Sequence, residues 1–278
     1  MYIPPLLKEI PNPPKKLYHL GNFEKDDRPH IAIVGTRKAT ASGIAIARSF
    51  AKELASAGAV IVSGLATGID TAAHEGALDA KGKTIAVLGN GIDWIYPRQN
   101  EKLAKRILES GGAIVSEYPA GIGTLKHQFL ERNRIVSGLS VGVIVIEAPQ
   151  KSGALSTASH ALEQNREVFV VPGPLNNENY AGSHGLLRAG ARVVSKPADV
   201  LDDLNLLSPA APAQLSILES GLDDKQKTIL AVLKHAGEPV SVDKIGELME
   251  SDVSTISRGL TFLLIRGLIK EEAGRYYL

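Results

Sequence analysis

Cationic and aromatic side chains alternate in one short stretch of this sequence, and together they could bind an anionic polymer. Residues 124–134 read TLKHQFLERNR, in which Glu131 is the only acid and the candidate ligand-binding side chains are Lys126, His127, Phe129, Arg132 and Arg134. Cations can hold a phosphate backbone while an aromatic ring stacks on a base, which contributes about 1–3 kcal/mol per base. The stretch therefore indicates single-stranded nucleic acid as the ligand. The structural alternative is that Phe129 fills the core and Arg132 or Arg134 braces a loop through backbone carbonyls.

A second candidate group follows the first apolar run, where residues 34–43 read VGTRKATASG. A dinucleotide-binding fold would carry the spacing G-x-G-x-x-G at this place. The sequence has Gly35, Thr36 and Arg37 instead, so NAD and FAD are poor candidates and no cofactor is expected. An arginine at a strand end, beside hydroxyl groups, suits a phosphate held by a charge-assisted hydrogen bond. The alternative for Arg37 is a solvated surface side chain.

The elements that would position these groups are indicated by seven short apolar runs separated by helix-length segments. The runs are IAIV (31–34), AVIVSG (59–64), TIAVLG (84–89), AIVSE (113–117), VGVIVIEA (141–148), EVFVVPG (167–173) and the weaker ARVV (191–194). Strands that are apolar on both faces and alternate with helices predict an α/β fold, with a mostly parallel sheet and helices on both of its faces. Ligands of such sheets bind beyond the carboxyl ends of the strands.

Glycine-containing loops follow these strands and should converge on that edge of the sheet. Glycine lets backbone N–H groups approach a ligand closely, and a helix N-terminus behind such a loop attracts phosphate. For a single loop, a tight strand–helix turn explains the glycine equally well, whereas several convergent loops favour an anion site. The candidate residues in these loops are Gly35, Thr36, Arg37, Ser63, Gly64, Ser152 and Gly153.

The chain should divide into a large unit and a small one. Residues 1–29 are rich in proline and read as a lead-in that packs on the main domain at 30–206, and LSPAAPAQLSILESG (207–221) reads as a linker. Residues 222–278 then hold three amphipathic segments and a hairpin, which is the winged-helix pattern. Residues 221–278 contain eight Lys/Arg and nine Asp/Glu, a difference of −1. Since duplex affinity comes largely from phosphate neutralisation, this unit should bind duplex DNA weakly.

Composition excludes several classes of function. The chain has 278 residues, a net charge of +1 and no cysteine, so disulfides, thiolate zinc sites and thiol catalysis are excluded. The histidines lack the spacing of metal ligands, so no metal is expected, and His74 should be a structural hydrogen-bonding group on a helix. No signal peptide or apolar membrane span is evident, and a cytoplasmic location is expected.

Six motifs in order resemble the DNA-processing protein A (DprA/Smf) family over roughly residues 10–205. They are VGTRKATASG, SGLATGIDTAAHEGAL, GNGIDWIYPRQN, SEYPAGIGTLKHQFLERNRIVSGLS, VIVIEAPQKSGALSTASHAL and REVFVVPGPL. The resemblance implies an extended Rossmann-like fold that binds single-stranded DNA without catalysing a reaction. It also implies protection of incoming DNA in natural transformation, help in loading the RecA recombinase, and a homodimer.

The resemblance also implies roles for individual residues. Arg37 and Lys126 would hold phosphates, Phe129 would meet a base, and the same basic pocket would be lined by Arg132, Asn133 and Arg134. Many members carry a small helical N-terminal domain, and from the length of this sequence we expect no such domain in it.

Two other functions remain open from the sequence. Related Rossmann-like folds hydrolyse the glycosidic bond of nucleoside monophosphates with a glycine-rich loop and an acid, and Glu147 at a strand end could be that acid, although no second positioned carboxylate is evident. The C-terminal unit could instead read duplex DNA as a regulator does.

Overall fold

The structure is a computed structural model of the 278-residue chain, and it describes residues 2–206, 222–236, 239–249, 251–265, 268–272 and 274–277. The chain divides into two compact units, Met1–Leu207 and Ser208–Leu278. The predicted linker, 207–221, lies outside the described residues.

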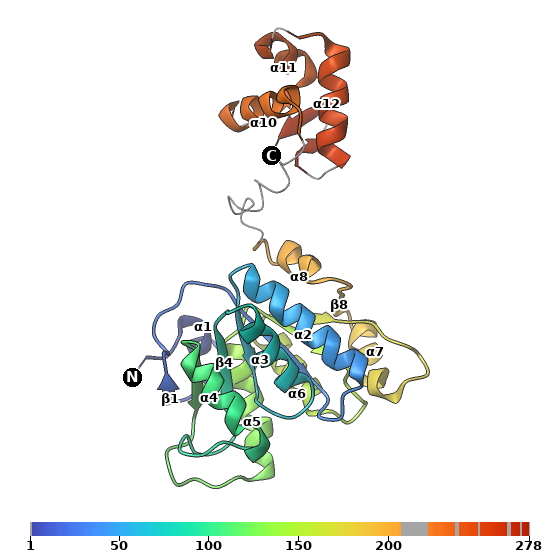
Figure 1. Ribbon diagram of the computed structural model, residues 1–278. Coiled ribbons are helices and arrows are strands. Elements are labelled where there is room, and N and C mark those ends of the chain that lie inside the picture. Colours follow the sequence, from blue (N-terminus) through green and yellow to red (C-terminus); the bar gives the residue numbers. More distant parts are fainter. Residues whose placement is uncertain are drawn as a thin grey trace. The chain divides into compact units, whose positions relative to one another are not determined.

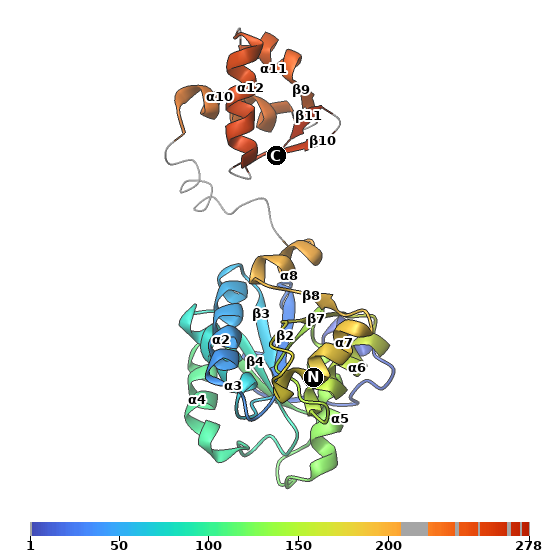
Figure 2. The same ribbon diagram turned by 90° about the vertical axis from the view of Figure 1, so that its right-hand side faces the viewer.

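An eight-stranded sheet forms the centre of the first unit (Figures 1 and 2). Its strand order is β1-β5-β4-β3-β2-β6-β7-β8, and every neighbouring pair is parallel except β1 with β5. The seven apolar runs form β2 (His30–Gly35), β3 (Val60–Ser63), β4 (Thr84–Leu88), β5 (Ala113–Ser116), β6 (Gly142–Ile146), β7 (Glu167–Val170) and β8 (Arg192–Val193). The prediction of a mostly parallel sheet is confirmed.

Helices cover both faces of the sheet, which explains why its central strands are apolar throughout. Along β2, Ile31 and Ile33 belong to the core under α2 (Ala41–Ser56) and α3 (Ile69–Asp79). The alternate residues, Ala32 and Val34, belong to the core under α5 (Lys126–Gly138) and α6 (Gly153–Glu163). The remaining helical elements are η1 (Arg98–Asn100), α4 (Glu101–Glu109), η2 (Glu178–Tyr180), α7 (Ala181–Arg188) and α8 (Pro197–Asp203).

The lead-in contains two elements that the sequence analysis did not predict, α1 (Pro5–Lys8) and β1 (Tyr18–Gly21). Leu7 and Leu17 are fully buried, so the segment contributes to the core as well as packing on it. β1 pairs antiparallel with β5 at the edge of the sheet, and three of its four residues are exposed. A four-residue edge strand with exposed side chains has no apolar alternation, and its sequence therefore did not predict a strand.

In the described residues from 222 onward, the second unit shows three helices and a three-stranded antiparallel sheet of order β10-β11-β9. Its elements are α10 (Asp224–Ala236), β9 (Val240–Ser241), α11 (Val242–Met249), α12 (Val253–Ile265), β10 (Lys270–Glu272) and β11 (Arg275–Tyr277). The predicted helices and terminal hairpin are present, and β9 adds a strand that was not predicted. The winged-helix assignment stays a prediction.

Among the described residues, none of the helices combines the length and the apolar character that crossing a bilayer would need.

Candidate nucleic-acid interface

A cleft of about 660 Å³ lies at the carboxyl ends of β2, β3 and β6. The strand order reverses here, since the chain runs from β2 through β3 and β4 to β5 and then returns to the other side of β2 with β6. Open α/β sheets bind ligands at such a switch point. The walls come from the loops after β2, β3 and β6, from Tyr96 and from α5. The cleft is therefore where the glycine loops were expected to converge.

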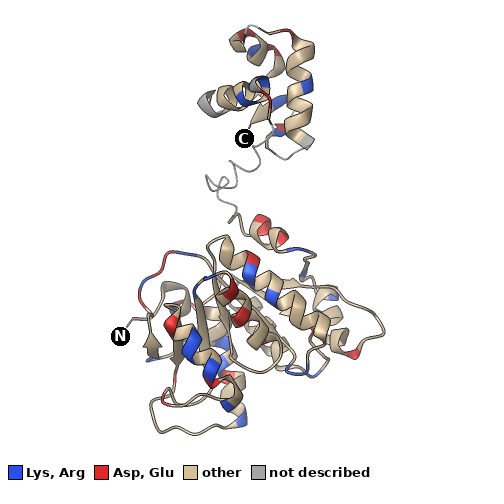
Figure 3. Cartoon of the chain, in the orientation of Figure 1, with Lys and Arg blue, Asp and Glu red and all other residues tan. Residues whose placement is uncertain are grey.

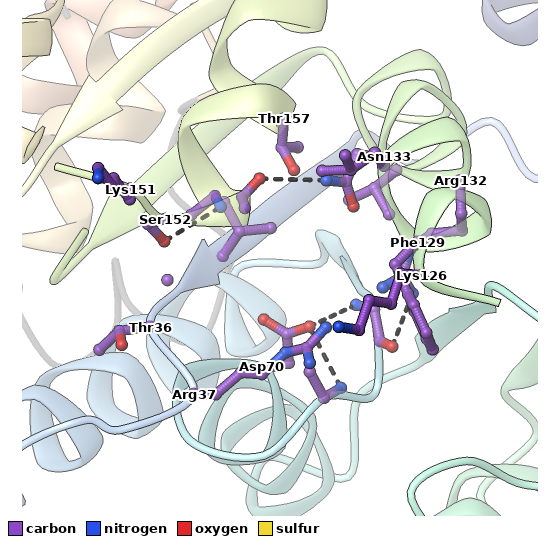
Figure 4. A pocket seen from close by; sticks show the side chains of 18 of the residues that line it. Thr36, Arg37, Asp70, Lys126, Phe129, Arg132, Asn133, Lys151, Ser152 and Thr157 are labelled. Carbon is purple, nitrogen blue, oxygen red and sulfur yellow. Dashed lines mark hydrogen bonds between the residues drawn. The ribbon is translucent and has the colours of Figure 1, made fainter. Parts of the chain in front are cut away.

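Three exposed cations line the cleft without an ion-pair partner in the part of the chain that the structure describes: Arg37, Lys126 and Lys151. Arg37 follows β2, Lys126 is the first residue of α5, and Lys151 precedes α6. Figure 4 shows Arg37 and Lys126 extending into the pocket from different elements. Because no carboxylate of the described residues neutralises them, these cations can bind an anionic ligand.

Phe129 is packed against the protein and also partly exposed to the cleft, so it fits in part both alternatives, a core residue and a base-stacking residue. Its ring packs over Gly89, where an added Cβ would lie 2.9 Å from the ring, and it is only partly buried. The guanidinium carbon of Arg37 lies 5.4 Å from the centroid of the Phe129 ring, within the range of a cation–π interaction. The ring of Tyr96 lies 5.6 Å away on the same rim of the cleft. A partly exposed aromatic face therefore stands beside a free cation.

Arg132 lines the cleft from α5 and links the loop after β3 to strand β4. Its side chain is only 4% exposed, and its guanidinium donates to the carbonyls of Gly64, at 2.7 Å, and Val87. Gly64 is needed for this approach, because an added Cβ would lie 2.5 Å from the guanidinium nitrogens. Burial lowers the pKa of Arg132 to about 10; the nearby Asp70 carboxylate opposes this shift and Arg37 adds to it. The structural alternative stated for Arg132 is thus realised, although the residue also lines the cleft.

Asp70 sits at the floor of the cleft as the counter-charge of this arginine. Its carboxylate accepts hydrogen bonds from the backbone N–H groups of Gly64, at 3.1 Å, and Ala66, at 3.3 Å. Burial raises the pKa of Asp70, and the Arg132 guanidinium acts in the opposite direction. The pair fixes the loop after β3 in the shape that forms the cleft.

The other predicted residues divide between the cleft and the interior. Gly35, Thr36, Asn133, Ser152 and Gly153 line the cleft. Asn133 donates to the Gly153 carbonyl at 3.1 Å, and Ser152 caps α6 by accepting from the N–H of Ala154 at 3.2 Å. The Asn133 contact holds α5 against the start of α6, and the Ser152 cap fixes the first turn of α6 itself.

The structure does not bring Arg134 and Ser63 to the cleft. The Arg134 guanidinium forms an ion pair with both carboxylate oxygens of Glu117, at 2.7 and 2.8 Å. On a helix, position 134 points away from the side on which 126, 129 and 133 gather. Ser63 is fully buried and donates to the carbonyl of Ile33 at 2.7 Å. Among the predicted residues, these two therefore have structural partners and no access to the ligand space.

Glu147, the acid of the enzymatic alternative, is fully buried and does not line the cleft. Its carboxylate accepts from the Thr40 N–H at 2.8 Å, from the Thr40 hydroxyl, and from the Asn179 amide at 3.2 Å. Thr40 is the N-cap of α2, so the negative charge lies at the N-terminus of a helix, where it is stabilising. The backbone carbonyl of Glu147 accepts a hydrogen bond from the Thr36 N–H at 2.7 Å. This bond joins the loops after β2 and β6.

Five polar or aromatic cleft residues were missed from the sequence: Asp70, Tyr96, Thr124, Lys151 and Thr157. Tyr96 and Lys151 lie in loops that were expected at this edge, so their positions after strands were a usable signal. Asp70 lines the cleft from the first turn of α3 and Thr157 from the second turn of α6. Only the rotation of each helix, which the sequence pattern did not resolve, brings them to the cleft. The prediction for His74 is confirmed, since this buried side chain hydrogen-bonds the Thr84 hydroxyl at 2.7 Å. No cluster of three potential metal ligands occurs among the described residues.

Comparison with known proteins identifies the family. A family model described as DNA recombination-mediator protein A matches residues 1–205. The chain is 39% identical to Protein Smf of Escherichia coli, over 99% of this chain and 74% of that protein. It is 43% identical to the DNA processing protein DprA of Bacillus subtilis, over 71% of this chain and 67% of that protein.

Two solved structures share the architecture. DNA processing protein A from Streptococcus pneumoniae aligns with a TM-score of 0.68 and 42% identity, over 72% of this chain and 70% of that one. The Helicobacter pylori protein, whose structure is described as showing a unique single-stranded DNA binding mode, aligns with a TM-score of 0.66 and 36% identity, over 74% of this chain and 94% of that one. The chain therefore belongs to the DNA recombination-mediator protein A family, as its six motifs indicated.

Proposed function

We propose that the first unit binds single-stranded DNA in the cleft at the switch point and acts by holding the strand, without catalysing a reaction. One observation carries the proposal: Arg37 and Lys126, both exposed and free of ion pairs with described residues, stand beside the partly exposed ring of Phe129. The single-strand binding described for the Helicobacter pylori relative supports it.

The geometry favours a single strand over a duplex. Bases that stack on Phe129 must be unpaired and turned outward, whereas the bases of a duplex are already stacked on one another. Arg37 and Lys126 would hold the phosphates on either side of such a base. The N-terminus of α6 adds backbone N–H groups at Gly153, which is exposed and has open space where a Cβ would lie.

The site is local because the chain is nearly neutral. The exposed helices α2 and α4 carry both signs of charge along their length, as Figure 3 shows, and the whole chain has a net charge of +1. Phosphate contacts dominate the salt dependence of nucleic-acid affinity. Binding by this protein should accordingly depend on a few cations, and removing one of them should have a large effect.

The arrangement of Glu147 supports binding without catalysis over glycosidic hydrolysis. A general acid or base must reach the substrate with a free oxygen. Both oxygens of this carboxylate accept hydrogen bonds from Thr40, and the group is buried outside the cleft. Release of free base from nucleoside monophosphates, abolished by Glu147→Gln, would contradict the proposal.

On the basis of family membership, we further propose that the protein protects incoming DNA in natural transformation and helps to load a RecA-type recombinase. We also propose that it works in the cytoplasm as a homodimer. The measurements are the rate of recombinase filament assembly on single strands with and without the protein, and the molar mass by light scattering. Unchanged assembly or a monomeric mass would overturn the corresponding part.

The binding proposal is tested by Arg37→Ala and Lys126→Ala, measured with fluorescent oligo-dT over a series of salt concentrations. Each substitution should weaken binding and reduce the slope of log K against log salt by about 0.7 for the phosphate contact that it removes. Lys52→Ala, an exposed cation on α2, is the matched control and should leave both quantities unchanged. If the double variant binds as the wild type does at every salt concentration, the site is wrong.

A further inference from the structure

A row of three aromatic rings runs outward from the cleft. The Phe129 and Tyr96 ring centroids are 5.6 Å apart with planes tilted by 41°, and those of Tyr96 and Trp94 are 6.2 Å apart with a tilt of 57°. Tyr96 lines the cleft and is 38% exposed, and Trp94 is partly exposed. The row therefore begins at the predicted base-stacking residue and continues along the turn after β4.

Hydrogen bonds hold this turn in place before any ligand arrives. The amide of Asn90, which is fully buried, donates to the carbonyls of Gly91 at 2.9 Å and Trp94 at 2.8 Å. The Gly91 N–H donates to the carbonyl of Ile122 at 2.9 Å, which ties the turn to the loop after β5. Since the backbone is fixed from two sides, little ordering would be needed when a ligand binds.

The surface beside the row is apolar. Ile122, Leu125 and Leu130 are 38%, 55% and 52% exposed, and they come from the loop after β5 and from α5. Leu130 lines the cleft together with Tyr96, and the Ile122 carbonyl accepts from the Gly91 N–H in the turn. Exposed apolar side chains therefore lie on segments next to the row, as is common at binding sites. The carboxylate of the turn itself, Asp93, accepts from the Gly121 N–H at 3.0 Å and would repel phosphates. This part of the surface suits bases, while the phosphates pass on the outside.

The rings could serve only to pack the two loops together. A tyrosine buried for structural reasons usually finds a hydrogen-bond partner for its hydroxyl. The Tyr96 hydroxyl has none among the described residues, and more than a third of the residue is exposed. The ring is therefore presented at the surface without being anchored through its polar end.

We propose that Tyr96 and Trp94 extend the single-strand site beyond Phe129, by stacking on bases of the nucleotides that leave the cleft. This inference rests on the proposed function. It adds to it the direction in which the strand leaves the cleft and a longer stretch of bound nucleotides. Each ring should contribute as one stacked base does, so its loss should weaken the binding of a long oligonucleotide by about 5- to 150-fold. Oligonucleotides short enough to fill only the cleft should bind as before.

Trp94 is the only tryptophan of the chain, so the emission of the intact protein reports on this position. Titration with oligo-dT of increasing length should leave the emission unchanged for the shortest strands that bind and quench it for longer ones. Affinities are then measured for Trp94→Ala and Tyr96→Leu, with Trp94→Phe and Tyr96→Phe as matched controls that keep a ring. The first pair should lose affinity for long strands only, and the second pair should stay close to the wild type.

Failure of this inference differs from failure of the proposed function. Suppose that oligo-dT binds with the salt dependence expected of Arg37 and Lys126. If saturating long strands then leave the Trp94 emission unchanged, and Tyr96→Leu binds them as the wild type does, the proposed extension is wrong. The proposal that the cleft binds a single strand would still hold. If oligo-dT does not bind the wild-type chain, both proposals are wrong. The emission measurement needs no substitution, so it decides the question even if a variant does not fold.

Discussion

Replacement of Arg132 by methionine tests whether this arginine of α5 has a structural role, distinct from the phosphate-binding role proposed for Lys126. The side chain is nearly completely buried and donates to the Gly64 and Val87 carbonyls, and it lies close enough to Asp70 to affect the pKa of that carboxyl. Methionine has a similar length and no charge. The substitution would leave two buried carbonyls without these donors and one buried carboxylate without its cation.

The expected cost can be worked from these contacts. An unsatisfied buried acceptor costs about 1–3 kcal/mol, and a buried charge left without compensation costs up to about 3–5 kcal/mol. Asp70 keeps its hydrogen bonds from the Gly64 and Ala66 N–H groups, so the two contributions should not add in full. We expect Arg132→Met to lower the free energy of unfolding by about 3–5 kcal/mol at neutral pH.

This loss should shrink in acid. The pKa of Asp70 in the folded state is raised by burial above its ordinary value, and removal of Arg132 raises it further. Between the unfolded and folded pKa values the folded state binds a proton that the unfolded state does not, so folding gains stability as the pH falls. The gain in stability on acidification is larger in Arg132→Met than in the wild type. Protonation removes the Asp70 charge that the variant leaves uncompensated.

Urea unfolding at neutral and at acidic pH tests this reasoning, with the emission of Trp94 as a probe of the first unit alone. Arg134→Met is the matched control from the same helix; its partner Glu117 still reaches water, so a smaller loss is expected. A loss for Arg132→Met below 1 kcal/mol, or one that grows as the pH falls, would refute the electrostatic account of this arginine.

Two further stability changes are expected. Thr40→Ala should cost about 1–2 kcal/mol in urea unfolding, because it removes the N-cap bond to the Gly43 N–H and a donor to Glu147, whereas Thr40→Ser should restore most of the loss. Burial lowers the pKa of His74 from 6.5 to about 3. Between these two pH values the unfolded state binds a proton that the folded state does not, so the free energy of unfolding falls as the pH is lowered. His74→Asn should reduce the slope of unfolding free energy against pH by about 1.4 kcal/mol per pH unit. An unchanged slope would show that the imidazole does not take up a proton on unfolding.

Periodicity predicted most of the sheet because burial on both faces leaves a direct trace in the sequence. Each strand from β2 to β7 is a run of apolar residues, since helices cover it on both sides. β1 left no such trace: it is held by backbone pairing with β5, and its outer side chains are exposed. An edge strand of this kind is determined by its neighbour, which a sequence pattern does not reveal.

The location of the cleft and part of its lining were predicted from the sequence. Residue type and spacing selected Arg37, Lys126 and Phe129, which the fold brings to one cleft. The same reasoning selected Arg134, which pairs with Glu117 from a loop before the helix. Arg134 is paired because the Glu117 carboxylate, seventeen positions earlier in the chain, lies next to its guanidinium. Only the tertiary structure shows that these two groups are close.

The rotation of α5 explains why one basic stretch performs two tasks. Lys126 and Phe129 are separated by three positions and line the cleft. Arg132 instead donates to carbonyls of the loop after β3 and of strand β4. If the buried arginine moved, the floor at Gly64 would shift and the exposed side chains would lose their geometry. If the cleft binds a single strand as proposed, binding depends on a cation that the ligand need not touch. The number of positive charges in the sequence then exceeds the number of phosphate contacts. The salt slope measures that number directly, because only cations that release counterions contribute to it.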